Sequence, residues 1–153
     1  MVSINVGWGL QRFLSRGIFL SMRKKTGKIT IMPGVENVLP WEMHSAMAII
    51  KLGIDVTFKP RHMSSRSADA YLNHTLFEFK SPEGKTIKCV ENNLQKALRF
   101  QSKNIVIDSC RIKNLSDKNI EHYLVCRMQR KRGIRRIIFV NRSGIAVDIN
   151  SLI

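Results

Sequence analysis

One short segment constrains this chain most: an aspartate followed by a strand that carries Glu-x-Lys. The segment covers residues 69–80 and reads Asp-Ala-Tyr-Leu-Asn-His-Thr-Leu-Phe-Glu-Phe-Lys. Because side chains alternate along a strand, Glu78 and Lys80 share one face and the neighbouring phenylalanines lie on the other. Burying such an ion pair without a function would be costly. Two carboxylates beside a lysine can hold a hard divalent cation and activate water for phosphodiester hydrolysis, so the segment indicates a nuclease.

The charge of the chain favours a polyanionic partner. Its 153 residues carry 26 Lys and Arg against 11 Asp and Glu, a formal net charge of +15. With 44% apolar residues, a chain of this length can form one compact domain. Eight of the 11 acidic residues lie within residues 31–110, between basic flanks. This balance favours nucleic acid, with an anionic membrane surface second, and the acidic middle favours a metal-dependent nuclease over an architectural protein.

Residue spacing disfavours several other classes. Cys89, Cys110 and Cys126 form no Cys-x-x-Cys pair, so neither a structural zinc site nor a disulfide framework is expected. Arg12 and Arg16 interrupt the only long apolar stretch, which predicts no transmembrane segment. A signal peptide is not expected, because no positive charge precedes that stretch and no small-residue cleavage site follows it. The histidines show no paired spacing, which disfavours a metal-independent ribonuclease. They are His44, His62, His74 and His122.

The pattern of elements predicts an α/β fold. A basic amphipathic helix is expected over residues 8–22, followed by a linker over residues 24–34 that glycine and proline break. We therefore divide the chain into residues 1–34, the helix and linker, and residues 35–153, the nuclease domain. The domain has the order αβββαβαββ. Helices are expected over residues 39–52, 87–103 and 116–133, and strands over 54–59, 70–73, 75–80, 104–109, 136–141 and 145–149.

This order and these residues resemble the PD-(D/E)XK nuclease superfamily over residues 36–110. The resemblance implies an αβββαβ core with a mixed central sheet flanked by helices, extended here by a C-terminal helix and two strands. It implies Asp69, Glu78 and Lys80 as the motif residues. It also implies Glu42 as the acid of the leading helix. The residue before Asp69 is alanine rather than the proline of the superfamily name.

The resemblance also implies a metal centre. Asp69 and Glu78 would hold one Mg²⁺ or Mn²⁺, with the carbonyl oxygen of Phe79 as a further ligand. Glu42 would assist as a metal ligand through a bound water. Lys80 would orient the attacking water and offset the charge that develops on phosphorus. The products would carry 5′-phosphate and 3′-hydroxyl ends.

Each candidate residue also has an ordinary structural explanation. Glu78 and Lys80 can form a surface ion pair, and Asp69 can open a strand or turn. Glu42 can be a first-turn acid favoured by the helix dipole. Gln101 continues an apolar helical stripe, so it either joins the catalytic residues or lies at an exposed helix end.

Within the superfamily, the chain looks most like the C-terminal toxin domains of contact-dependent growth inhibition and related polymorphic toxins, many of which cleave transfer RNA. The likeness rests on residues 69–82, the helix end at 96–101 and the strand at 104–108. It implies a bacterial toxin domain that acts in the cytoplasm of a target cell, and a cognate, acidic immunity protein. Asp108 is expected to form a cap or turn at the end of its strand rather than to bind metal.

A basic run near the C-terminus is a candidate phosphate-binding surface. Helical spacing places Arg127, Arg130 and Lys131 on one side, and at this net charge we favour phosphate contact over a merely solvated face. The expected nucleic-acid-binding residues are Arg127, Arg130, Lys131, Arg132, Arg135 and Arg136.

Three function classes remain open. The favoured class is a metal-dependent nuclease that cleaves RNA, most simply transfer RNA, as a bacterial toxin domain. A DNA endonuclease of a mobile element or of a repair or recombination system is the alternative, because the same metal site serves both polymers. A non-catalytic nucleic-acid-binding module is disfavoured, because all four motif positions carry competent residues.

Overall fold

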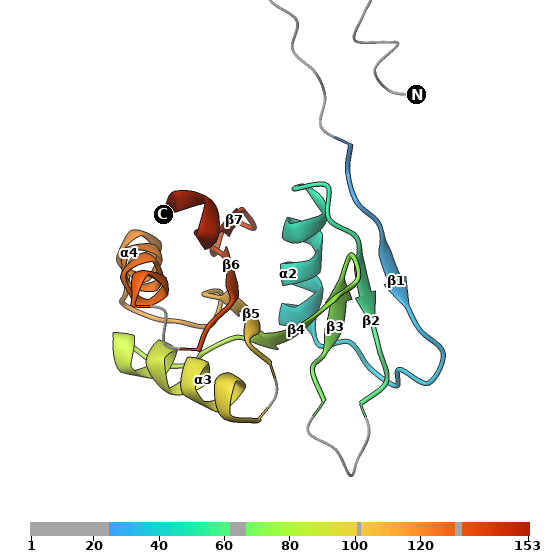
Figure 1. Cartoon of the computed structure of the whole chain (residues 1–153), viewed down its shortest axis with the longest axis horizontal. Helices are drawn as coiled ribbons and strands as arrows, with labels where there is room; N and C mark the ends of the chain where they lie inside the picture. Colours follow the sequence, from blue (N-terminus) through green and yellow to red (C-terminus); the bar gives the residue numbers. More distant parts are fainter. Residues whose placement is uncertain (1–24, 62–66, 101, 131–132) are drawn as a thin grey trace, which may run out of the picture.

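The computed structural model describes residues 25–61, 67–100, 102–130 and 133–153. Figure 1 labels its strands and helices. Three expectations lie outside these residues: the helix over residues 8–22, the placement of Gln101, and the two basic residues Lys131 and Arg132.

One mixed sheet organises the domain. Its seven strands lie in chain order, β1 to β7. The pairs β1–β2, β4–β5 and β5–β6 are parallel, and the other three are antiparallel. The strands are β1 (Ile29–Ile31), β2 (Val56–Phe58), β3 (Ala70–Leu72), β4 (Thr75–Lys80), β5 (Asn104–Asp108), β6 (Arg136–Val140) and β7 (Ala146–Asp148).

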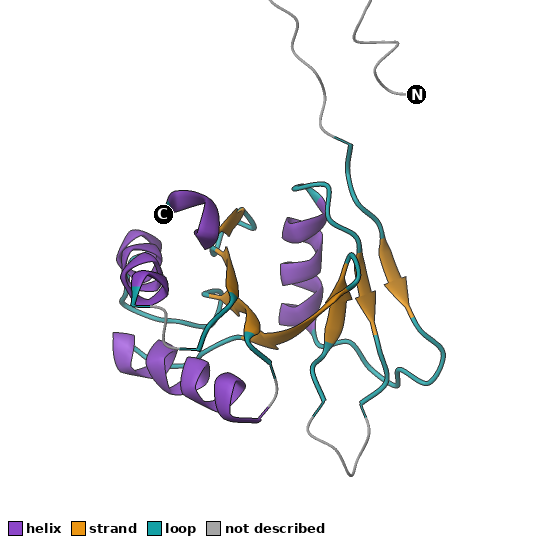
Figure 2. Cartoon of the chain, in the orientation of Figure 1, coloured by secondary structure: helices purple, strands orange, loops and turns teal. Residues whose placement is uncertain are grey.

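Helices cover both faces of this curled sheet, as Figure 1 and Figure 2 show. One core lies between the sheet and α2 and contains Phe77 and Phe79. The other core lies beneath α3 and α4 and is built around Leu94 and Leu124. The helices are α2 (Pro40–Ile50), α3 (Ile87–Phe100), α4 (Asp117–Gln129) and the 3₁₀ helix η1 (Ile149–Leu152). The expected α/β fold with a mixed, helix-flanked sheet is confirmed.

Local chemistry explains where the elements begin and turn. Pro40 opens α2, where its missing N–H costs no helical hydrogen bond. The Ser116 hydroxyl accepts a hydrogen bond from the Asn119 N–H at 3.1 Å and so caps α4. Asn73 adopts a φ of 53° in the turn between β3 and β4, a left-handed conformation that asparagine tolerates. The order αβββαβαββ and the Asn73-His74 turn are therefore confirmed.

The expectation of a linker over residues 24–34 is wrong at its centre. Ile29–Ile31 form β1, which pairs in parallel with β2. Gly27 permits the approach, because a Cβ there would lie 2.1 Å from the carbonyl oxygen of Ile54. The glycine is thus required by close strand packing rather than by a break in the chain.

The C-terminal end departs from the expectation in a smaller way. The last strand ends at Asp148, and the Asp148 carboxylate accepts a hydrogen bond from the Asn150 N–H at 3.2 Å to start η1. Across the residues that the structure describes, no helix has the length and apolar character needed to cross a membrane.

Candidate functional site

Asp69 stands at the centre of the candidate site. It precedes β3, one step beyond the paired residues Ala70 and Phe77, so it lies opposite Glu78 on β4. One carboxylate oxygen, Oδ2, accepts a hydrogen bond from the Phe79 N–H at 2.9 Å. These contacts fix the Asp69 carboxylate beside that of Glu78.

Glu78 is a buried carboxylate with incomplete hydrogen bonding. Its side chain is 2% exposed, which excludes an ordinary surface ion pair. Oε1 accepts a hydrogen bond from the Lys80 ammonium at 2.6 Å, whereas the buried Oε2 has no hydrogen-bond partner among the residues that the structure describes. Native proteins rarely leave a buried polar atom unpaired, so Oε2 is an atom at which a ligand could bind.

The electrostatics of Glu78 follow from this position. Burial and, next, the nearby Asp69 charge raise the pKa of Glu78 against the opposing effect of Lys80, and the net result is a pKa of about 7. Perturbed carboxylates of this kind are typical of functional sites, although structural ion pairs produce them as well.

Arg61 joins the acid of α2 to this pair. Its guanidinium forms ion pairs with Glu42 and, at 2.8 Å, with Asp69. Glu42 is buried and also accepts a hydrogen bond from the Leu39 N–H at 2.8 Å. Glu42 therefore has two roles: it stabilises the start of α2, and its carboxylate faces Arg61 at the candidate site. Sequence reasoning missed Arg61, because its spacing from Glu42 and Asp69 follows no local period.

Arg61, Glu42 and Asp69 line a cavity of about 370 Å³. Lys59 and Val38 also line it. Carboxylate oxygens are the ligands that hard divalent cations prefer; Asp69 supplies them in the cavity wall, and Glu78 lies beside Asp69. With Oε2 of Glu78 unpaired, the residues present fit such a cation.

We expect Arg61→Leu to lower the free energy of unfolding of the metal-free chain by roughly 1–3 kcal/mol, since two buried carboxylates lose their cation. Mg²⁺ should raise the stability of this variant more than that of the native chain, because the carboxylates of Glu42 and Asp69 no longer have Arg61 to balance their charge. Thermal unfolding with and without Mg²⁺ measures both effects. Lys59→Leu, which alters the same cavity without touching either carboxylate, is the matched control; equal responses in both variants would contradict the expectation.

The structure corrects the expected basic face on one point. Arg127 is buried, at 6% exposure, and pairs with Glu91 of α3 at 3.3 Å. Its pairing with Glu91 therefore keeps Arg127 inside the domain, where it cannot offer an open phosphate contact. Arg130 and Arg135 are exposed, and Arg136 pairs with Asp148 at 2.7 Å.

Glu91→Leu should destabilise the fold by roughly 3 kcal/mol, because it leaves the Arg127 charge buried without a partner. Glu121→Leu, which removes a carboxylate from the same region outside this pair, should change stability much less. Urea unfolding of the two variants measures the difference. A loss in Glu91→Leu no larger than that in Glu121→Leu would show that Arg127 finds water or another partner.

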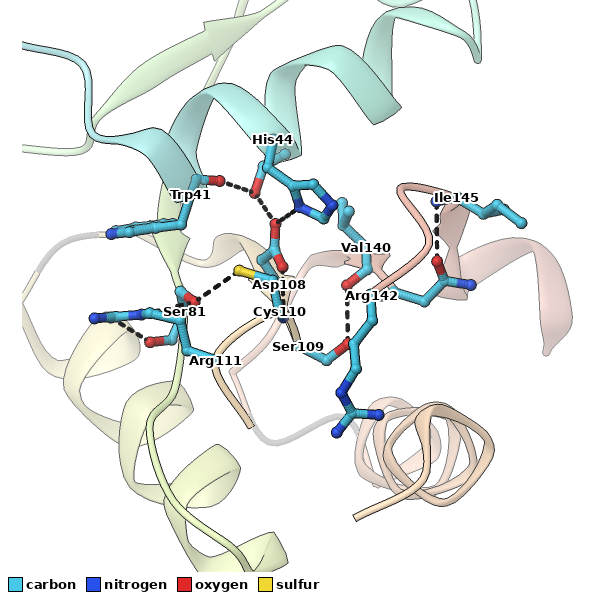
Figure 3. A network of polar contacts seen from close by, with 12 residues as sticks. Trp41, His44, Ser81, Asp108, Ser109, Cys110, Arg111, Val140, Arg142 and Ile145 are labelled. Carbon is cyan, nitrogen blue, oxygen red and sulfur yellow. Dashed lines mark hydrogen bonds and ion pairs between the residues drawn. The ribbon is translucent and has the colours of Figure 1, made fainter. Parts of the chain in front are cut away.

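A second cluster of polar side chains lies at the end of β5, on the face of the sheet that α2 covers. His44 Nδ1 lies 2.6 Å from Asp108 Oδ2, and Cys110 lies close by (Figure 3). The expected capping role of Asp108 is confirmed, because its Oδ1 accepts a hydrogen bond from the Cys110 N–H at 2.8 Å. Its contact with His44, which comes from α2, was not foreseen.

Comparison with known proteins identifies the class of this domain. Residues 66–145 match the family described as the contact-dependent growth inhibition CdiA C-terminal domain. This match spans more than half of the chain, which therefore belongs to that family, a class of bacterial toxin domains.

A solved structure shares the fold. It is described as a CdiA-CT/CdiI toxin and immunity complex from Burkholderia pseudomallei. The match has a TM-score of 0.60 and 16% sequence identity, and covers 80% of this chain and 98% of the other. No curated protein matches the chain.

Proposed function

We propose that this toxin domain is a metal-dependent nuclease of the PD-(D/E)XK type that cleaves RNA, most simply transfer RNA. The observation that carries the proposal is the buried Glu78 carboxylate: one oxygen accepts a hydrogen bond from Lys80, the other has no partner among the described residues, and Asp69 lies alongside. Structural ion pairs rarely leave a buried oxygen unpaired, which supports a ligand-binding role.

Asp69 and Glu78 would hold Mg²⁺ or Mn²⁺, and Glu42 would support the ion through a bound water. When bound, such a cation polarises the scissile phosphate and lowers the pKa of an attacking water. The Phe79 N–H fixes the Asp69 carboxylate at 2.9 Å, so this ligand is held in place before any ion arrives.

Lys80 is suited to position water at the reacting phosphate. Its ammonium donates to Glu78 Oε1 at 2.6 Å, and its side chain is 20% exposed, so the ammonium is fixed on one side and accessible on the other. A fixed positive charge at that place offsets charge that develops on phosphorus.

The charge of the chain supports a nucleic acid substrate. A formal net charge of +15 attracts polyanions, and the exposed Arg130 and Arg135 supply phosphate contacts near the C-terminal end of the fold.

Membership of the growth-inhibition family favours RNA over DNA, and cytoplasmic action in the target cell follows from a transfer RNA substrate. A DNA endonuclease is the alternative, because the carboxylates and lysine serve either polymer.

An immunity protein is the proposed partner. The similar Burkholderia pseudomallei structure is described as a toxin and immunity complex. A cognate partner of this chain would be acidic, since it must bind a surface of formal net charge +15.

The proposal is tested by incubating the chain with total transfer RNA and with duplex DNA in the presence of Mg²⁺, with a chelator control. We expect cleavage of transfer RNA that the chelator stops. Cleavage confined to duplex DNA would keep the metal site and replace the substrate. Cleavage of RNA that persists with the chelator would contradict the metal-dependent mechanism.

A further inference from the structure

A cluster of three potential metal ligands joins α2 to the end of β5. His44 comes from α2, Asp108 is the last residue of β5, and Cys110 follows in the loop. One ligand atom from each lies within 4.8 Å of the others. Figure 3 shows the three side chains converging between the helix and the strand end.

The cluster lies on the other face of the sheet from Glu78 and Lys80 of the proposed catalytic site. Glu78 pairs in register with Ile105 and Lys80 with Ile107, residues of the core beneath α3 and α4. Asp108 follows Ile107, so its side chain alternates to the opposite face, beneath α2. Glu78 and Asp108 therefore lie on opposite faces of the same pair of strands.

Hydrogen bonds fix the orientation of the Asp108 carboxylate, as they do for carboxylate ligands of metal ions. Its side chain is fully buried. Oδ2 accepts a hydrogen bond from the Ser45 hydroxyl at 2.7 Å, and Oδ1 accepts one from the Cys110 N–H at 2.8 Å. Supporting contacts of this kind orient the ligands of metal centres.

We propose that His44, Asp108 and Cys110 form a second metal site, which takes a borderline ion such as Zn²⁺. An imidazole, a carboxylate and a thiolate are the donor types that zinc combines, whereas Mg²⁺ prefers oxygen ligands alone. The three residues supply three of the four tetrahedral positions, and a water completes the set. His44 and Cys110 are partly exposed, which leaves a route for the ion and that water.

Binding changes the protonation of two ligands. In the metal-free state His44 Nδ1 shares a proton with Asp108 Oδ2, at 2.6 Å. An ion can bind Nδ1 only after that proton leaves, to Nε2 of a neutral imidazole or to solvent from an imidazolium. The Cys110 thiol loses its proton to solvent as the sulfur–metal bond forms. His44 Nδ1 and Asp108 Oδ2 must also separate by roughly 0.7 Å to fit zinc bonds of about 2.0 Å in tetrahedral geometry.

The ion would connect α2 to the loop after β5. These elements are far apart in the chain, because His44 and Asp108 are separated by 64 residues. An ion that binds only the folded state stabilises it in proportion to the logarithm of its concentration. Zn²⁺ should therefore raise the melting temperature of the chain at micromolar concentrations, and Mg²⁺ should not do so through this cluster.

Cobalt spectroscopy of the full chain tests the proposal. Co²⁺ replaces Zn²⁺, and a bound thiolate gives an intense near-ultraviolet charge-transfer band. A competing pair exists on α4, where Cys126 Sγ lies 3.7 Å from His122 Nε2. The starting protein therefore carries Cys89→Ser and Cys126→Ser, which leaves Cys110 as the only thiol.

In this protein we expect one Co²⁺ with a thiolate band, displaced by Zn²⁺. Adding Cys110→Ser should abolish the band, and His44→Gln should weaken ion binding at least tenfold. Both variants should keep the metal-free melting temperature within a few degrees; if Cys110→Ser fails to fold, His44→Gln decides alone. A missing band in the starting protein, or Co²⁺ affinity unchanged by His44→Gln, would overturn the proposal.

Discussion

Replacing Glu78 with glutamine should lower the rate of Mg²⁺-dependent RNA cleavage by at least about 10³-fold and also stabilise the metal-free fold above pH 7. The variant loses a charged metal ligand, which explains the loss of activity. Glutamine keeps an oxygen that can accept the hydrogen bond from Lys80, so the local packing is preserved. The opposite signs of the two effects distinguish a functional carboxylate from a structural one.

The stabilisation follows from the raised pKa of Glu78, which burial lifts from the ordinary 4.5 to about 7. The folded state favours the protonated form of Glu78. The stabilisation that this protonated acid contributes is therefore fully present below pH 4.5 and is lost as the pH rises through 7. Glutamine remains neutral and avoids that loss, which is on the order of 1–3 kcal/mol at pH 8.

Urea unfolding at pH 5 and pH 8, together with single-turnover cleavage, measures both effects. Glu83→Gln is the matched control, because Glu83 is 68% exposed and pairs with Arg111 outside the site. Glu83→Gln should leave cleavage and its pH dependence unchanged. Full cleavage by Glu78→Gln would remove Glu78 from the mechanism.

Lys80→Met should lower cleavage by about 10²- to 10⁴-fold, since the fixed charge at the reacting phosphate is lost. A second effect accompanies this loss. Lys80 opposes the upward shift in the pKa of Glu78, so its removal raises that pKa further. The remaining activity should therefore need a higher pH than that of the native chain.

The pH profile of single-turnover cleavage separates this account from a general loss of folding. Lys85→Met, at an exposed lysine on the loop after β4, is the control and should retain the native profile. If the midpoint of the pH profile of Lys80→Met equals that of the native chain, the ammonium does not act on the pKa of Glu78.

The elements around the motif could be predicted because their signals are local. Asn73 marks the turn, and the alternation of Phe77 and Phe79 marks the buried face of β4. The short edge strand β1 gives no such signal, since Thr30 and Ile31 are both exposed. Its place in the sheet depends on pairing with β2, which lies far along the chain.

The contacts between distant segments could not be predicted. Arg61 meets Glu42 and Asp69 only after β2 and α2 pack, and His44 meets Asp108 across 64 residues. Arg127 lies in a basic run whose helical spacing predicted an exposed, phosphate-binding surface. Its partner, Glu91, comes from another helix. A single sequence shows which residues have suitable chemistry, whereas tertiary packing decides which of them come together.

The central claim is that Asp69 and Glu78 hold a catalytic divalent cation. Electron paramagnetic resonance with Mn²⁺ at pH 8 tests it most directly, with the native chain, Glu78→Gln and Cys110→Ser in parallel. The account predicts one bound Mn²⁺ in the native chain and in Cys110→Ser, and at least tenfold weaker binding in Glu78→Gln. Equal Mn²⁺ binding by the native chain and Glu78→Gln would contradict it.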